Sequence, residues 1–322
     1  MTRKIASALI LITTSLLLLD SAHAFPDRPV KFVVSSPAGG PPDIMARLLS
    51  DKLAAALGQP VVVENRPGGA GGTIGAKSVL SAEPDGHTLL MGSTSSLLIA
   101  PLIYKTAGYT AETFAPVAGL AETAEVLAIH PAVKAGSVTE LITLAKSQPG
   151  VLRYGSAGIG SLPHVEGELL KERAGIDIRH IPYRGGGPAL TGLLGGEVHI
   201  FFSALTQMLP YVGDGRLRGL AVTSETRSAL APDIPTMVES GFDQFVTASV
   251  NFIVAPPGTP VAIRRQVSDA VARALASDEV RRTFAKMGAT ARPASPEELA
   301  GYVAKQQDRW SRIVETTRIS VE

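Results

Sequence analysis

The 322-residue sequence contains no cysteine and a single tryptophan, and its formal net charge is only +1. Without cysteine the chain can form no disulfides and no thiolate metal site, so its hydrophobic core must stabilise it. About 300 residues can bury such a core, and this length suggests two domains. A near-neutral chain also lacks the positive electrostatic field that attracts nucleic acids and anionic membranes. We therefore expect no nucleic-acid partner, and any anionic ligand must be held by local groups.

Long apolar runs are confined to the N-terminus. Two basic residues there precede an apolar run over 5–19, and Ala22-His23-Ala24 offers the small-x-small pattern of a cleavage site. The unbroken part of the run, 8–19, is shorter than the roughly 20 residues of a transmembrane helix. We predict that 1–24 is a secretory signal peptide, cleaved after Ala24, and that the mature protein is periplasmic. The residue after the cleavage point is not cysteine, so no lipid anchor is expected.

Strand and helix patterns alternate along the mature chain, which predicts an α/β fold with mostly parallel sheets. The first series has strands at 30–35, 61–64 and 88–91 with helices between them, the first of which ends at Gly58. A less regular region over 106–124 follows, and then the alternation resumes. Its strands are predicted at 126–129, 152–155, 178–181, 198–202 and 217–222, with helices at 137–148 and from about Leu162, Pro188 and Leu205.

Two helices are predicted to finish the chain. One starts at Thr259-Pro260, with proline at its first position, and runs to about Ala276. The other opens with the capping box Ser295-Pro296-Glu297-Glu298. Its apolar stripe includes Trp310, and the helical spacing of this stripe places the tryptophan in the core rather than at a ligand.

Polar, glycine-rich segments stand where predicted strands end and helices begin. Ligands of open parallel sheets bind beyond the carboxyl ends of the strands. The free backbone amides of a helix start also attract carboxylates. Any one such segment could be an ordinary turn, but several in both halves of the chain predict a cleft. The segments are Ser36–Asp43, Ser93–Ser96, Ser156–His164 and Gly185–Ala189.

Candidate ligand contacts come from these segments and from the residue after the strand at 198–202. His164, in the first turn of a helix, either points into the cleft or hydrogen-bonds locally. Asp43 either caps its helix or accepts a hydrogen bond from a polar group of the ligand. The Gly39-Gly40 loop is expected to hold an anion with its amides. The candidates are Ala38, Gly39, Gly40, Asp43, Ser93, Thr94, Ser156, Ala157, Ser161, His164, Gly186, Ala189 and Ser203.

The signatures of common enzymes are missing from the sequence. There is no Gly-x-Ser-x-Gly elbow and no Gly-x-Gly-x-x-Gly dinucleotide pattern, and Gly75-Ala76-Lys77-Ser78 lacks the glycine that a P-loop needs before its lysine. The histidines are scattered singly, which makes a transition-metal site improbable. We predict a binding protein without catalytic residues, metal or cofactor. A periplasmic enzyme on a similar scaffold is the alternative.

Several short motifs follow one another in a distinctive order along the mature chain. They include Pro37-Ala38-Gly39-Gly40-Pro41-Pro42-Asp43, Tyr154-Gly155-Ser156-Ala157-Gly158 and Ile181-Pro182-Tyr183-Arg184-Gly185, together with 25–30, 58–68, 84–90, 217–223 and 255–260. In this order they resemble the tripartite tricarboxylate transporter receptors, often called Bug proteins.

The resemblance implies a two-lobed periplasmic binding protein fold of type II-like topology. Each lobe would be a mostly parallel sheet flanked by helices, with the ligand cleft between the lobes. Residues 25–122 and 250–322 would form lobe one and 123–249 lobe two, with crossings near 120–125 and 247–252. It further implies a receptor that closes over a small organic carboxylate and delivers it to membrane transporter subunits, and we expect the protein to be a monomer. A ligand sensor for a signalling receptor would look the same.

Two positions depart from the pattern of the family. Its members often have aspartate where Ser203 stands, and a tryptophan-x-glycine segment where this chain reads Val250-Asn251-Phe252. Serine in place of a carboxylate is expected to make the pocket less negative, and Phe252 adds bulk near a crossing. Both changes leave the identity of the acid open.

Overall fold

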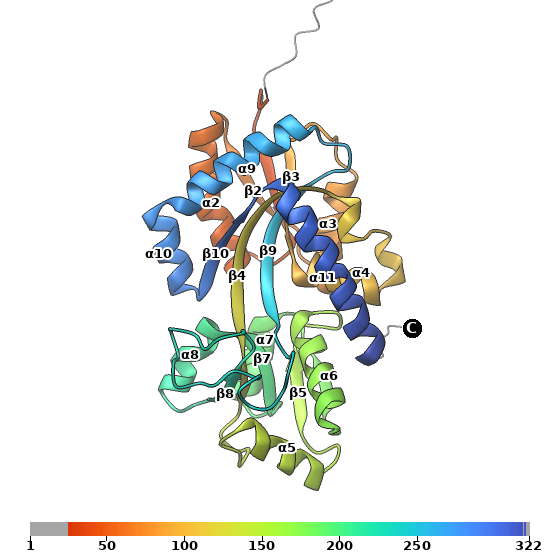
Figure 1. Ribbon diagram of the computed structural model, residues 1–322, viewed down its shortest axis with the longest axis vertical. Helices are drawn as coiled ribbons and strands as arrows, with labels where there is room; N and C mark the ends of the chain where they lie inside the picture. Colours follow the sequence, from red (N-terminus) through yellow and green to blue (C-terminus); the bar gives the residue numbers. More distant parts are fainter. Residues whose placement is uncertain (1–24, 318, 320–322) are drawn as a thin grey trace, which may run out of the picture.

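Two strands, β4 (Ala115–Ile129) and β9 (Ala248–Ala255), pair antiparallel in the middle of the molecule and link its two lobes (Figure 1). The computed structural model describes residues 25–317 and residue 319. Within these residues the strands follow the order β2-β1-β3-β9-β4-β7-β5-β6, and β8 and β10 each pair with β4. The predicted signal peptide, 1–24, lies outside the described residues.

The first lobe is built on parallel strands that the sequence makes apolar on both faces. Phe32 and Val33, adjacent on β1, enter different cores because successive side chains of a strand point to opposite faces. Helices α2, α9 and α10 cover one face of the sheet, and α3, α4 and α11 cover the other. The parallel strands are β1 (Val30–Val34), β2 (Val61–Asn65) and β3 (Thr88–Ser93), and β10 (Ala289–Ala294) runs antiparallel to β4. The helices are α2 (Pro41–Leu57), α3 (Thr73–Leu80), α4 (Ala100–Ile103), α9 (Val261–Ala276), α10 (Asp278–Lys286) and α11 (Pro296–Thr317), with short turns η1 (Ala70–Gly72), η2 (Thr94–Ile99), η3 (Lys105–Ala107) and η4 (Ala111–Thr113).

The second lobe continues the sheet from the C-terminal part of β4. There β5 runs parallel to β6 and β7, whereas β7 and β8 run antiparallel to β4. Helices α5 and α6 pack on one face of this sheet and α7 and α8 on the other. The strands are β5 (Arg153–Ser156), β6 (Arg179–Pro182), β7 (Ile200–Ala204) and β8 (Arg218–Val222). The helices are α5 (Val138–Ser147), α6 (Leu162–Ala174), α7 (Gly186–Leu194) and α8 (Leu205–Gly213).

The predicted two-lobed α/β fold is confirmed, and so are its local details at the C-terminus. Trp310 is 2% exposed and lies in the core. The capping box forms as expected, because Ser295 N–H donates to the Glu298 carboxylate and Glu298 N–H donates to Ser295 Oγ. Pro260, however, is the N-cap of α9 rather than its first helical residue.

Two expectations about elements are wrong. The region 106–124 is not irregular throughout, since β4 begins at Ala115. Its residues lack simple alternation because β4 pairs with both β9 and β10, and a Cβ at Gly119 would lie 2.4 Å from the Arg292 carbonyl oxygen of β10. The chain also forms α10 and β10 between the two helices predicted at its end.

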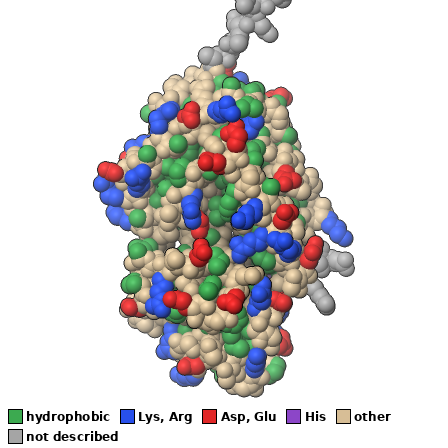
Figure 2. Space-filling model, in the orientation of Figure 1, with side chains coloured by type: hydrophobic (Ala, Val, Ile, Leu, Met, Phe, Trp, Pro, Cys, Tyr) green, Lys and Arg blue, Asp and Glu red, His purple; other side chains and the backbone are tan. Residues whose placement is uncertain are grey.

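Charged side chains of both signs are interspersed over both lobes on the face shown in Figure 2. This distribution fits the near-neutral sequence, whose formal charge is +1. In the described part of the chain, no helix combines the length and apolar character needed to cross a membrane.

Candidate ligand-binding site

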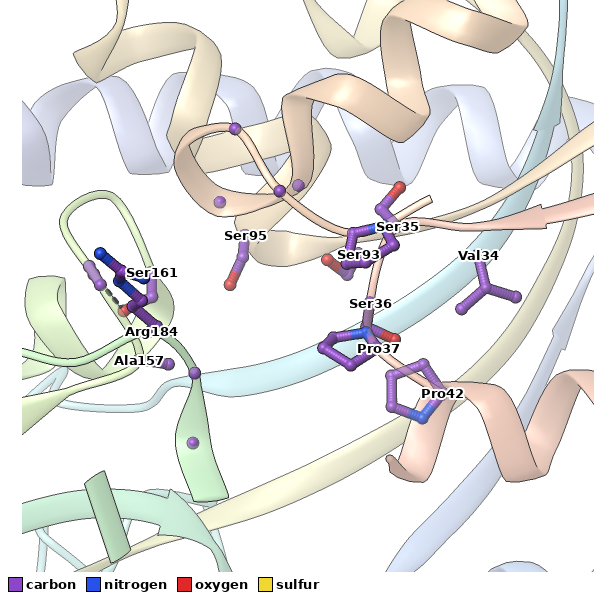
Figure 3. Close-up of a pocket in the computed structure, with 18 of the residues that line it drawn as sticks. Val34, Ser35, Ser36, Pro37, Pro42, Ser93, Ser95, Ala157, Ser161 and Arg184 are labelled. Atoms are coloured by element: carbon purple, nitrogen blue, oxygen red, sulfur yellow. Dashed lines mark hydrogen bonds between the residues drawn. The ribbon is translucent and has the colours of Figure 1, made fainter. Parts of the chain in front are cut away.

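A cavity of about 830 Å³ lies between the two lobes. The first lobe supplies its β1–α2, β2–α3 and β3–η2 loops, and the second lobe supplies its β5–α6 and β6–α7 loops. Figure 3 shows Ser35, Ser36 and Pro37 on one side of the cavity, facing Ala157 and Arg184 on the other. The lining residues are Val34–Pro37, Pro42, Pro67–Gly69, Gly71, Gly72, Met91, Ser93, Ser95, Tyr104, Ala157–Ile159, Ser161, Pro182–Gly186, Ser249 and Asn251.

The wall of the cavity is polar but carries almost no charge. Its polar groups are chiefly serine hydroxyls and the backbone of the glycine-rich loops. Among the described residues that line it, Arg184 is the only charged side chain. Arg184 is exposed, and within residues 25–317 its guanidinium makes no ion pair with a carboxylate. One end of the cavity therefore offers an unpaired positive charge to an anion.

The β2–α3 loop is part of the wall that the sequence reasoning missed. Gly68, Gly69, Gly71 and Gly72 all have positive φ, between 62° and 102°, which L side chains rarely adopt. A Cβ at Gly71 would lie 2.9 Å from the Ala100 Cβ and 3.3 Å from the carbonyl oxygen of Gly160 in the other lobe. The glycines thus let two backbones from different lobes approach at the edge of the cavity. The dense cluster of glycines after the strand predicted at 61–64 is the feature of the sequence that could have identified this loop as part of the wall.

The lobes also touch through hydrogen bonds beside the cavity. The N–H of Leu162, the first residue of α6, donates to Ser95 Oγ of the first lobe at 3.1 Å. The hydroxyl of Tyr104 donates to the carbonyl of Ile159 at 3.1 Å. Burial raises the pKa of Tyr104, so this hydroxyl stays a donor at neutral pH. The β5–α6 loop is therefore the part of the second lobe that contacts the first beside the cavity, and Thr206 on α8 makes a separate contact by donating to the Met287 carbonyl.

The predicted site residues fall into two groups. Ser93, Ala157, Ser161 and Gly186 line the cavity. The others lie beside it or behind its walls: Ala38, Gly39, Gly40, Asp43, Thr94, Ser156, His164, Ala189 and Ser203.

Asp43 caps its own loop instead of facing the cavity. Its Oδ2 accepts from Gly39 N–H at 2.9 Å and from Arg47 Nε at 3.0 Å. Burial acts to raise its pKa, but these bonds from Arg47 and Gly39 hold it below the usual value. Pro41 and Pro42 occupy the first positions of α2 and have no N–H to offer. The start of α2 thus presents fewer free amides to an anion than the sequence suggested.

Other candidates hold the framework of the site. Thr94 Oγ1 donates to the Ala248 carbonyl and accepts from Val250 N–H, which ties η2 to β9. Ser203 Oγ donates to Gln207 on α8. His164 was expected either to point into the cleft or to hydrogen-bond locally; in the structure it is 6% exposed and is not part of the cavity lining. Its Nδ1 accepts from Gly160 N–H at 3.2 Å, so this nitrogen is occupied by a local hydrogen bond.

No three histidine, aspartate or glutamate side chains within the described ranges gather closely enough to hold a metal ion.

Comparisons with known proteins place the chain among receptors of one transport family. The model of the tripartite tricarboxylate transporter family receptor matches residues 45–319. Protein BugT of Bordetella pertussis is 37% identical over 320 residues, which are 98% of each chain. The structure of the periplasmic binding protein BugD is 32% identical with a TM-score of 0.84, covering 92% of this chain and all of that one.

Two further solved structures contain a ligand. R. palustris Rpa4515 with adipate is 33% identical with a TM-score of 0.85, covering 92% of this chain and 99% of that one. MatC from Rhodopseudomonas palustris with bound malate is 33% identical with a TM-score of 0.83, covering 90% of this chain and 100% of that one.

Proposed function

Because the chain belongs to the tripartite tricarboxylate transporter receptor family, we propose that it captures a small organic carboxylate in the periplasm and delivers it to a membrane transporter. On this proposal residues 1–24 are removed after Ala24 on export. Lobe one comprises 25–122 and 250–322, and lobe two comprises 123–249. Relatives with bound adipate and malate support the ligand class, and the family's description supports the transporter as recipient.

The observation that carries the proposal is the lining of the cavity. Its wall offers hydroxyls, backbone groups and the one cation of its described lining, Arg184, and no acidic side chain among those residues opposes an anion. Hydrogen bonds and charge at short range can therefore hold a carboxylate even though the whole chain is nearly neutral. The size of the cavity, about 830 Å³, suits a small organic acid with its hydrating waters.

Ligand capture would work by closure of the lobes about β4 and β9. A ligand that contacts both lobes binds the closed arrangement more tightly than the open one, and this difference in affinity shifts the population towards closure. The β2–α3 and β5–α6 loops belong to different lobes, approach one another at Gly71 and Gly160, and both line the cavity. Closure and ligand contact therefore use the same segments.

The arrangement does not support an enzyme. Within the described residues, no serine of the wall is hydrogen-bonded to an imidazole or a carboxylate. Ser156 does lie 2.7 Å from His180 Nε2, but its side chain is fully buried and outside the wall. A substrate in the cavity could not reach it as a nucleophile.

The proposal is tested by thermal unfolding of the mature chain, 25–322, against matched panels of acids and non-acids. The acids include malate, adipate, acetate and citrate, and the non-acids are sugars and polyols of similar size. A ligand at 100 times its Kd adds about 2.7 kcal/mol, which raises Tm by roughly 5 °C. We expect at least one carboxylate to do so, with affinity then measured by calorimetry. Stabilisation by sugars or cations and by no carboxylate contradicts the proposal.

A further inference from the structure

Three aromatic rings are stacked directly beneath the β5–α6 loop. Tyr154 on β5 and His180 on β6 are register partners with ring centroids 4.8 Å apart. His164 on α6 covers the other face of His180, with centroids 4.1 Å apart and planes inclined by 20°. The Tyr154 side chain is fully buried, and its hydroxyl donates to Glu168 on α6. The stack thus joins two strands and a helix at the end of the sheet that faces the cavity.

His164 is hydrogen-bonded directly to the loop above it, and His180 is linked to the same loop through Ser156, the last residue of β5. Gly160 N–H donates to His164 Nδ1 at 3.2 Å. Because a backbone N–H can only donate, His164 Nδ1 carries a lone pair, and the neutral ring holds its proton on Nε2. His180 Nε2 lies 2.7 Å from Ser156 Oγ, and the same oxygen accepts from Gly158 N–H at 3.1 Å.

We propose that His164 and His180 are positioning residues that, as neutral stacked imidazoles, hold the β5–α6 loop in the shape that lines the ligand cavity. Ala157, Gly158, Ile159 and Ser161 of this loop belong to the wall. Gly158 and Gly160 have φ of +121° and +76°, so the loop needs outside restraints to keep one conformation. That the loop contacts a ligand rests on the proposed function, whereas the geometry of the loop and of the stack does not depend on it.

The surroundings of the stack keep both rings uncharged. Burial lowers the pKa of His164 to about 4, with Glu168 acting against this and Lys171 with it. Burial, His164 and Lys171 lower the pKa of His180 to about 3. The charges of Lys171 and Glu168 are paired at 2.9 Å, and Tyr104 of the first lobe approaches the loop as a neutral hydroxyl. Between pH 5 and 8 the rings therefore remain neutral and His164 remains an acceptor.

The alternative is that the histidines merely fill the core. Two substitutions of His164 separate the roles. His164→Phe keeps an aromatic ring in the stack but has no acceptor for Gly160 N–H. His164→Asn loses the ring, but its Oδ1 can take the place of Nδ1 as an acceptor and cannot be protonated. His199→Phe is the matched control, because His199 Nδ1 also accepts a backbone N–H, that of Arg153, at the opposite end of β5.

The first measurement is hydrogen–deuterium exchange of loop 157–161 in the ligand-free mature protein at pH 7. We expect the Gly160 amide to exchange at least tenfold faster in His164→Phe, and near the wild-type rate in His164→Asn and His199→Phe. Affinity for malate or adipate, whichever binds, should fall about five- to tenfold only in His164→Phe. Unchanged exchange in His164→Phe, or equal loss in His164→Asn, would show a packing role alone and overturn the proposal.

The second measurement is the pH profile. After correction for intrinsic exchange, wild-type protection of Gly160 should decline as pH falls from 5.5 to 4, and that of His164→Asn should not. Nitrogen NMR should find His164 protonated on Nε2 at pH 7. Protection that is equally flat in both proteins, or a proton on Nδ1, overturns the proposal. Neither readout needs a ligand, so if no acid binds, the proposed function fails while these results still decide the role of the histidines.

Discussion

Arg184 is the side chain that gives the cavity wall its only formal charge among the described residues. An exposed arginine on a surface contributes little to binding, because water screens it. If the lobes close as proposed, the same guanidinium would lose water and could form a charge-assisted hydrogen bond with a carboxylate. The motif Tyr183-Arg184-Gly185 was visible in the sequence. Arg184 was nevertheless not among the predicted anion contacts, which were backbone amides and hydroxyls. Nothing in the sequence shows which loop side chains face the cavity.

Substitution of Arg184 by glutamine should weaken the binding of dicarboxylates. A hydrogen bond to a charged group is worth about 1.5–3 kcal/mol, so we expect the Kd of the best-binding dicarboxylate to rise tenfold or more in calorimetry. Arg179→Gln is the matched control, since Arg179 is an exposed arginine at the other end of β6. Equal affinities of wild type and Arg184→Gln would place the ligand away from this end of the cavity.

The same limit explains why some of the other candidate residues line the cavity and some do not. The sequence identified the loops that carry Ser93, Ala157, Ser161 and Gly186, and these residues line the cavity. Within the same or neighbouring segments, His164 and Asp43 turn away and satisfy local donors. Loop position follows from the alternation of strands and helices, whereas side-chain direction depends on backbone angles and on contacts made across the fold.

At the scale of elements, local signals were enough for most helices and strands. The helix end at Gly58 is a left-handed C-cap, with φ 76°, which glycine adopts most readily. By contrast, β10 pairs with β4 across the first lobe, and β4 pairs with strands of both lobes. Such long-range pairing leaves little trace in a single sequence, so β10 and the start of β4 could not be predicted from local pattern.

The β2–α3 loop provides a test of how closely the lobes must approach. Alanine at Gly71 would carry the strain of a positive φ and also press on Ala100 and on the Gly160 carbonyl. Gly39→Ala is the matched control, because Gly39 has φ +81° and nothing lies within 4 Å of its added Cβ. Each variant bears roughly 1–2 kcal/mol of strain.

We expect only Gly71→Ala to weaken ligand binding, by about tenfold, because its extra contacts separate the loops of the two lobes. Calorimetry with the same acid compares the two variants, and small-angle scattering with saturating ligand compares their compactness. If both variants bind equally, the approach of the two backbones at Gly71 is not needed for capture.

At the scale of the whole molecule, two buried carboxyl groups meet where the lobes join. Glu125 lies on β4 and Glu166 on α6, and they are 5% and 0% exposed. Thr247, next to β9, donates to Glu166 Oε1 at 2.5 Å. Burial raises the pKa of Glu166 well above its usual value, and Glu125 raises it further. Burial likewise raises the pKa of Glu125 to about 8.

These groups and the two stacked histidines give opposite dependences on pH. Carboxyls with raised pKa values bind more protons in the folded than in the unfolded state, so stability falls as pH rises from about 4.5 to about 8. Histidines with lowered pKa values bind more protons when unfolded, so stability rises as pH goes from about 3 to about 6.5. The protein should therefore be most stable in mildly acidic solution.

Glu166→Gln should remove much of the loss of stability on the alkaline side. The amide keeps an oxygen for Thr247 and never ionises, so Glu125 no longer faces a second carboxyl. A difference of one bound proton is worth about 1.4 kcal/mol per pH unit, or roughly 3 °C in Tm for a chain of this size. Over the two units from pH 6 to pH 8 this is about 2.8 kcal/mol, or roughly 6 °C, and we expect the fall in Tm over this range to shrink by up to that amount in scanning calorimetry. Glu172→Gln, at an exposed position on the same helix, is the control and should leave the fall in Tm unchanged. If the fall in Tm is also unchanged in Glu166→Gln, the carboxyl pair does not cause the loss of stability at alkaline pH.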